Sequence, residues 1–387
     1  MKPKSYILPI IILSQFACTS LWFAGNAIVD ELALKIGLGD ALAGYVLSSV
    51  QFGFIIGTLV FALLMIADRF SPSKVFLICA LLASICNAFL LLEQITQWTL
   101  LLARFGTGFF LAGIYPVGMK IAADYYEKGL GKALGYLVGA LVLGSAFPHF
   151  INGLQFSGAS GIVIKTTTII AIIGGLLLFV LVPNGPYRKS SPKIQLQAGI
   201  SLFKISAFRK AAFGYFGHMW ELYAFWGFTP LAIKTFNSIH HTNFSIPVWT
   251  FVVISVGTLS CIIGGYISLK IGSYKVALTA LLISGALCLL SPLLFSLPPI
   301  LFLIGWSIWG MAVIADSPQF SNLVASAAPP ELKGTGLTLV NCFGFAISIV
   351  SIQILSSILN DINPSYIFLL LAIGPIIGIW SLLQKSS

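Results

Sequence analysis

The chain has 387 residues, of which 58% are hydrophobic and only 8% are charged. A mean hydropathy of +1.00 excludes a soluble globular domain with a solvated surface and predicts a membrane protein. The formal net charge is +10, but no soluble basic segment accompanies it, so the sequence excludes a nucleic-acid partner.

Long apolar stretches recur along the whole chain, and each could cross a hydrocarbon layer about 30 Å thick as a helix. They predict an all-α polytopic membrane protein with about twelve transmembrane helices. The first stretch is too long, and too closely followed by a second, for a cleaved signal peptide, so we expect it to be retained. The predicted spans are 5–29, 41–67, 74–93, 97–124, 131–153, 161–183, 210–236, 247–269, 275–295, 299–326, 334–359 and 364–384.

A basic, hydrophilic stretch separates six predicted spans from the other six. We therefore expect a first six-helix bundle over 1–183, a cytoplasmic linker over 184–209 and a second bundle over 210–387. The halves also resemble each other, since "GTLVFALLMIADRF" from Gly57 has a counterpart from Gly257. An internal repeat of about 200 residues is typical of a transporter whose site lies between its two halves.

The Lys and Arg residues outside the spans predict the orientation. About seventeen fall on one side of the predicted topology, against Lys35, Lys165 and Lys234 on the other. Because cytoplasmic loops carry the excess of basic residues, we expect a multi-pass protein of the cell inner (plasma) membrane with both termini in the cytoplasm.

Two short motifs carry a family resemblance. The loop after the second span reads "ADRFSPSK" and places Asp68, Arg69 and Lys74 together, and the fourth span reads "RFGTGFFLAG" with Arg104 and Gly108. With the repeat and the topology, the chain resembles a bacterial branch of the major facilitator superfamily over essentially its whole length. The resemblance implies two six-helix bundles and alternating access, and it implies no substrate.

The loop of Asp68, Arg69 and Lys74 is the candidate gate. Ion pairs formed here with the facing bundle would hold the cytoplasmic mouth closed in one state and release it in another. Helix capping and membrane topology explain the same charges without any gating role.

Glu221 and His218 are the first candidates for proton coupling. Glu221 lies roughly 16 Å along its helix from the cytoplasmic end, near mid-depth, where charged groups are costly and usually functional. His218 lies three residues earlier, on the same face, so the two side chains can share a proton. We predict that Glu221 is the principal proton-coupling acid and that His218 tunes it. In the alternative, the pair only holds two helices together.

Asp316 and Arg104 are the other two candidates for proton coupling. Asp316 precedes Pro318 in the tenth span, where a proline bends the helix. Arg104 lies in the fourth span, and the resemblance assigns its position to proton relay, helix packing or substrate contact.

Aromatic and polar side chains within the spans are candidate solute contacts. The resemblance places the first and seventh spans around a central cavity, where tryptophan and tyrosine rings can stack on a ring or a cation. Positions facing lipid or its interface are the alternative. The candidate substrate-binding residues are Asn26, Trp22, Trp220, Tyr223, Trp226, His149, Gln319, Asn322 and Asn341.

The six cysteines show no metal-ligand spacing and are expected to be packing residues, so we expect neither a metal nor a cofactor. The predicted function is secondary transport of a small solute by alternating access, coupled to protons, by a monomer in the lipid bilayer. A polytopic membrane enzyme and a non-transporting receptor of the same fold are the alternatives. The two acids of the second half favour a cationic solute, whereas Arg104 and His149 favour an anion, and the sequence does not decide between them.

Overall fold

The structure of the chain is a computed structural model, and it describes residues 4–37, 39, 42–126, 130–154, 159–188, 194–359 and 361–384. Over these residues the chain is helical and contains no strand. Part of the predicted linker, 189–193, lies outside the described residues. The same holds for five basic residues that contribute to the charge asymmetry, Lys2, Lys128, Lys189, Lys193 and Lys385.

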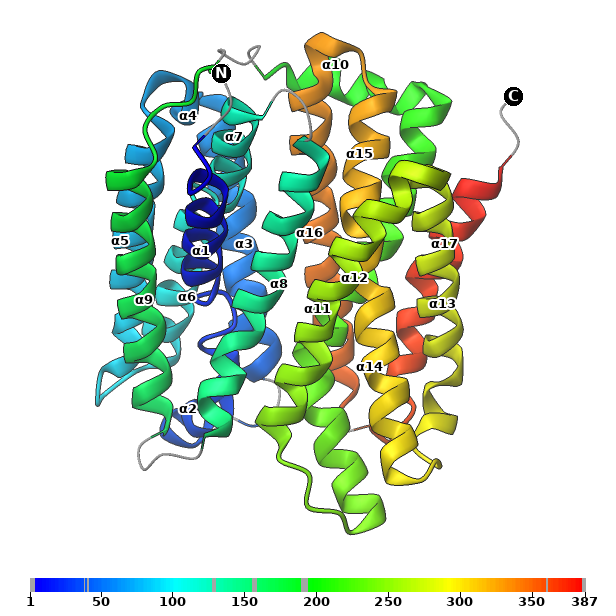
Figure 1. Cartoon of the computed structure of the whole chain (residues 1–387). Coiled ribbons are helices and arrows are strands. Elements are labelled where there is room, and N and C mark those ends of the chain that lie inside the picture. The colour runs from blue at the N-terminus through cyan, green and yellow to red at the C-terminus, as the bar shows by residue number, and fades with distance from the viewer. Residues whose placement is uncertain are drawn as a thin grey trace. The chain divides into compact units, whose positions relative to one another are not determined.

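The chain divides into two compact units, Met1–Ser191 and Pro192–Ser387. Figure 1 shows the first unit in blue to green, with α1 beside α8 and α9 and with α3 beside α6. The helices of this unit are α1 Ile7–Thr19, η1 Asn26–Ile28, α2 Val29–Ile36, α3 Leu42–Leu63, α4 Ile66–Arg69, α5 Pro72–Ala88, η2 Phe89–Leu91, α6 Gln97–Leu111, α7 Tyr115–Tyr125, α8 Leu130–Gly153 and α9 Ala159–Leu181.

The second unit is built around α11, which packs against α12, α14, α15, α16 and α17. At 35 residues α11 is long for a transmembrane helix. The helices of this unit are α10 Leu196–Ser201, η3 Leu202–Lys204, α11 Ser206–His240, α12 Ile246–Ile271, α13 Ser273–Leu294, α14 Pro299–Ala315, α15 Ser317–Ala327, η4 Pro330–Leu332, α16 Lys333–Ile358, η5 Ile367–Ala372 and α17 Ile373–Leu383.

The expected all-α polytopic class is confirmed. Within the described residues, nine helical segments are long and apolar enough to cross a membrane, and two shorter apolar helices cover Ile7–Thr19 and Ile367–Leu383. With α11, these segments correspond to the twelve predicted spans. The central part of α11 carries His218, Glu221 and several Trp and Tyr residues, and these lower its mean hydropathy below that of the other spans.

Several of the predicted spans are interrupted, and three of these breaks bear on the site. The prediction of one continuous span over 5–29 is wrong, because α1 ends at Thr19 and residues 20–25 form turns. The Thr19 hydroxyl donates to the carbonyl of Gln15 and the Ser20 hydroxyl donates to that of Ala17, so both bond back onto the last helical turn. The fourth span breaks between α6 and α7, before Pro116, and the tenth breaks at Asp316, before Pro318.

Glycines allow two neighbouring helices of the first unit to approach closely. A Cβ atom at Gly108 of α6 would collide with the carbonyl oxygen of Val50, and one at Gly53 of α3 would collide with that of Phe105. Small residues at both sides of the contact therefore let the backbones of α3 and α6 touch, as small residues do in membrane helix pairs.

Candidate functional site

The carboxyl group of Glu221, on α11, is buried against α13 and α14. Its Oε1 atom accepts a hydrogen bond from the indole Nε1 of Trp309 at 2.6 Å and one from the thiol of Cys288 at 3.4 Å. Its Oε2 atom is 3.0 Å from the Ser284 hydroxyl. Ser284 and Cys288 are four residues apart on α13, so both face Glu221 from one side of that helix.

Aromatic rings pack against Trp309, the indole partner of Glu221. The Trp309 ring packs 4.7 Å from Phe225 and 5.0 Å from Trp306, measured between ring centroids. Glu221 is 1% exposed and Trp309 is fully buried. A carboxyl group that is buried in this way makes few contacts with water, so hydrogen bonds to the protein are its main polar interactions.

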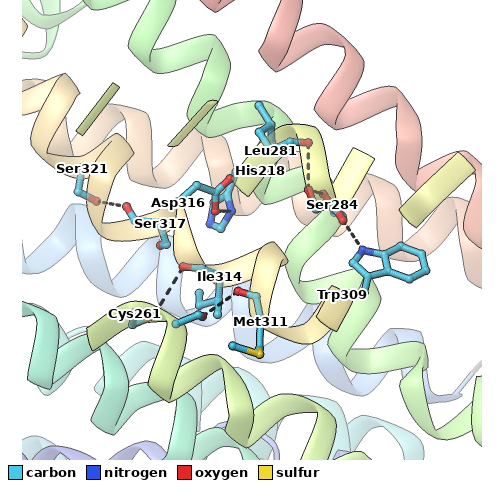
Figure 2. A network of polar contacts seen from close by, with 12 residues as sticks. His218, Cys261, Leu281, Ser284, Trp309, Met311, Ile314, Asp316, Ser317 and Ser321 are labelled. Carbon is cyan, nitrogen blue, oxygen red and sulfur yellow. Dashed lines mark hydrogen bonds and ion pairs between the residues drawn. The ribbon is translucent and has the colours of Figure 1, made fainter. Parts of the chain in front are cut away.

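His218 pairs with Asp316. Its Nδ1 atom lies 2.8 Å from Oδ1 of Asp316, and both side chains are 1% exposed. Figure 2 shows the two side chains next to each other, with Ser284 and Trp309 on neighbouring helices. The prediction that His218 pairs directly with Glu221 is wrong: within the described residues, the hydrogen-bond partners of Glu221 are Trp309, Ser284 and Cys288. Residues three apart share a helix face, but Asp316 reaches His218 from another helix.

The break between α14 and α15 positions Asp316. Pro318 has no N–H to donate to the carbonyl of Ile314, and the thiol of Cys261 on α12 donates to that carbonyl at 3.6 Å. The Ser260 hydroxyl, also on α12, reaches the carbonyl of Met311 at 2.7 Å. Side chains of α12 thus satisfy backbone groups beside the kink, as Figure 2 shows, and the kink holds Asp316 at its apex.

Arg104 binds the broken end of α1. Its guanidinium group donates to the carbonyls of Leu21, at 3.1 Å, and of Trp22, and to Oδ1 of Asn87 at 3.3 Å. A Cβ atom at Gly25 would lie 3.0 Å from Nε of Arg104, so glycine makes room for this side chain. Arg104 is fully buried, and these contacts engage its Nη1 and Nη2 atoms, whereas its Nε atom has no hydrogen-bond partner among the described residues. Of the three roles implied by the resemblance, helix packing is the one these contacts serve.

The candidate gate forms an ion pair and backbone hydrogen bonds within the first unit. Oδ1 of Asp68 lies 2.9 Å from Nζ of Lys120 on α7, and Arg188 donates to the backbone carbonyls of Asp68 and Phe70. Asp124, on the same face of α7 as Lys120, is also within electrostatic reach. The other two predicted gate residues, Arg69 and Lys74, are exposed.

Most of the predicted solute-binding residues of the second unit are hydrogen-bonded to, or packed against, other groups of the protein. Trp220 donates to the carbonyl of Leu370, and the side-chain oxygen of Asn341 accepts from the hydroxyl of Tyr215 at 2.7 Å. Tyr223 and Trp226 are buried and pack against each other. Gln319 is buried beside the kink.

Asn322 is the exception among these residues. It is exposed, and its amide donates to the Ser273 hydroxyl at the start of α13. Asn322 therefore lies on an exposed face in the middle of α15, and its role in solute binding stays a prediction.

The predicted solute-binding residues of the first unit are buried. Trp22 packs against Phe54, and His149 lies near Phe23. Asn26 donates to the carbonyl of Ala43. Oδ1 of Asn26 and Nε2 of His149 have no hydrogen-bond partner in the described part of the chain, and the same holds for both amide atoms of Gln15.

Sequence reasoning missed the groups that bind the candidate acids. Ser284, Cys288 and Trp309 surround Glu221, and Lys120 pairs with Asp68. Cys288 looks like any other small apolar residue in its span, so no local pattern identifies it. Trp309 is the exception in principle, because a buried indole N–H needs an acceptor.

The fold of the chain is similar to the folds of solved membrane transporters. The solved structure of the human organic anion transporter MFSD10 (TETRAN) matches with a TM-score of 0.75 and 14% identity, covering 99% of this chain and 100% of that one. The structure of a point mutant of the nucleoside transporter NupG matches with a TM-score of 0.74 and 15% identity, covering 97% of this chain and 99% of that one. No curated protein matches the sequence.

The family model described as Major Facilitator Superfamily matches residues 10–352. The chain therefore belongs to the major facilitator superfamily, and it is a multi-pass membrane protein of a transporter family.

Proposed function

We propose that the chain is a secondary transporter that moves a small solute by alternating access and couples this movement to protons. It lies in the inner (plasma) membrane with both termini in the cytoplasm, as the Lys and Arg asymmetry supports. The observation that carries proton coupling is the charge balance of the buried groups on α11, α13 and the α14–α15 kink.

This buried region carries more acid than base. Glu221 and Asp316 are both buried acids, and His218 is the basic group that contacts Asp316. A protonated His218 balances an ionised Asp316, but the three partners of Glu221 are neutral hydrogen-bonding groups. A buried carboxylate without a counter-charge is costly, so Glu221 is stable in its buried position when it carries a proton or when a cation accompanies it.

The first unit supports solute binding through neutral hydrogen bonds. The Nη1 and Nη2 atoms of Arg104 donate to Asn87 and to the backbone of the broken α1, so these two groups are not available to a solute anion. Gln15, Asn26 and His149 retain buried polar atoms without hydrogen-bond partners in the described residues. Buried polar groups are normally satisfied, so these atoms are the proposed solute contacts.

Proton movement into proteoliposomes tests the proposal. The purified full-length protein is reconstituted with a pH-sensitive dye inside, and a nucleoside, an organic anion, an organic cation, an amino acid and a sugar are added in turn. We expect at least one solute class to move protons across the membrane, and empty liposomes to show none. Solute uptake with no proton movement, or uptake that requires Na⁺ in place of K⁺, would contradict proton coupling.

A further inference from the structure

The hydrogen bonds of Glu221 are distributed unequally between its two oxygens. Oε1 accepts from Trp309 and from Cys288, whereas Oε2 has a single partner among the described residues, Ser284. An indole N–H is a donor only and cannot accept a proton, and a thiol sulfur is a weak acceptor. A proton that binds this carboxyl therefore goes to Oε2, because Oε1 already faces two donors.

The Ser284 hydroxyl has two possible targets for its one hydrogen. Its Oγ atom lies 3.0 Å from Oε2 of Glu221 and 3.3 Å from the backbone carbonyl of Leu281, one turn earlier on α13. Figure 2 shows Ser284 beside Leu281. A hydroxyl has one hydrogen and can also accept, so it can donate to either neighbour, and when it donates to Leu281 its oxygen is free to accept.

We propose that Ser284 switches its hydrogen between Glu221 and Leu281 as Glu221 loses and gains the coupling proton, an inference that rests on the proposed function. When Glu221 is ionised, Ser284 donates to Oε2. When a proton from water binds Oε2, the new O–H donates to Ser284 Oγ, and the serine hydrogen rotates to the Leu281 carbonyl. No covalent bond breaks in the protein, and both forms of the buried carboxyl remain hydrogen-bonded.

None of the titratable groups near Glu221 in the described residues can take the role of Ser284. The groups that act on Glu221 from the helices packed against it are Cys288 on α13 and Asp316 at the kink, and His218 is held by Asp316. Cys288 faces Oε1. Within the described residues, Ser284 is therefore the strong acceptor in contact with Oε2. It is a positioning residue, because it acts through Glu221.

Infrared difference spectroscopy of the purified full-length protein tests the switch. The spectrum is recorded between acidic and alkaline buffers, and the C=O stretch of protonated Glu221 is the band absent from Glu221→Gln. Ser284→Ala leaves the acid O–H without its acceptor, so we expect this band at a higher frequency. Ser284→Thr keeps the hydroxyl and should restore the wild-type frequency.

Ser291→Ala is the matched control, because Ser291 is a buried serine of α13 whose hydroxyl donates to the backbone carbonyl of Cys288. Its band should not move. A Glu221 band at the wild-type frequency in Ser284→Ala would overturn the switch and leave proton coupling intact. A wild-type protein without any Glu221-dependent band would overturn both. Should Ser284→Ala not fold, Ser284→Cys gives the same reading with a smaller upward shift, because a thiol is a weak acceptor.

Discussion

The two buried acids of the second unit have different partners, and this difference separates their proposed roles. Asp316 has a basic side chain in contact, because Nδ1 of His218 lies 2.8 Å from its Oδ1 atom. Among the residues that the structure describes, Glu221 has neutral donors only, so its proton must come from elsewhere. For this reason we place the coupling proton on Glu221 and give the His218–Asp316 pair an electrostatic role.

A double-mutant cycle distinguishes the observed pair from the pair that the sequence predicts. We expect His218→Gln and Asp316→Asn to couple by at least about 1 kcal/mol in unfolding free energy, because breaking a buried pair leaves one group uncompensated. The cycle of His218→Gln with Glu221→Gln should show weaker coupling. Stability in a denaturant series on purified protein measures both, and equal coupling in the two cycles would contradict the assignment.

Sequence patterns were sufficient to select the candidate acids, but they did not predict which groups contact these acids. The rarity of charge inside apolar spans was enough to select Glu221, Asp316, His218 and Arg104. Their partners could not be predicted, because Asp316 reaches His218 through tertiary packing and Ser284 resembles many other serines in the spans. Helix spacing alone led to the wrong partner for His218.

At the scale of helices, one side chain, that of Arg104, binds the break at the end of α1. Residues 20–25 leave the helix, and Arg104 of α6 binds two of the carbonyls that the break exposes. Hydropathy could not reveal this break, because "LWFAG" is as apolar as the helix before it. The breaks before Pro116 and Pro318 are easier to predict from the sequence, because proline removes a backbone donor.

Replacing Arg104 should destabilise the first unit even when the charge is kept. Arg104→Lys loses the planar fork that contacts two carbonyls and Asn87, and a hydrogen bond to a charged group contributes about 1.5 to 3 kcal/mol. We expect the variant to unfold at a lower temperature than wild type in detergent. Unchanged thermal stability would show that the guanidinium contacts are dispensable.

Gly25→Ala tests the same contact from the other side. Its Cβ atom would lie 3.0 Å from Nε and 3.1 Å from Cδ of Arg104, so the arginine must shift and its bonds to the broken α1 should weaken. Gly161→Ala is the matched control, because among the described residues no atom beyond its chain neighbours and the backbone of its own helix lies within 4 Å of the added carbon. We expect a lower unfolding temperature for Gly25→Ala alone, and the same unfolding temperature in both variants would argue against steric coupling.

The ion pair between α4 and α7 is the element-scale candidate for gating. Asp68→Asn and Lys120→Gln should change the transport rate in the same direction, and the charge swap Asp68→Lys with Lys120→Asp should recover part of the lost rate. Turnover in proteoliposomes, with the solute found by the dye assay, measures this. If the swap is as impaired as the single variants together, the pair does not act through its charge, and Asp68 has only a topological role.

For the whole molecule, the family assignment and the orientation depend on different observations. The match over residues 10–352 shows membership of the superfamily, and composition alone predicted the all-α membrane class. Orientation depends on the asymmetry of Lys and Arg. The solute could not be predicted, because the residues that would distinguish an anion from a cation are engaged with protein groups, as Arg104 and Asp316 are.

A reporter fusion tests the orientation of the whole chain. Residue 205 precedes α11 and lies in the segment expected in the cytoplasm. A periplasm-active reporter joined after this residue should be inactive, and one joined after Ile239, at the other end of α11, should be active. Activity after residue 205 together with inactivity after Ile239 would contradict the proposed orientation.

The central claim is that Glu221 carries the coupling proton, and transport by Glu221→Gln in proteoliposomes tests it most directly. Glutamine keeps the shape of the side chain and its ability to accept from Trp309, but it cannot bind and release a proton. We predict that a pH gradient no longer drives accumulation of the solute identified in the dye assay, while exchange of that solute at equal pH continues. Accumulation driven by the pH gradient in Glu221→Gln at the wild-type level would contradict the account and move the coupling site to Asp316.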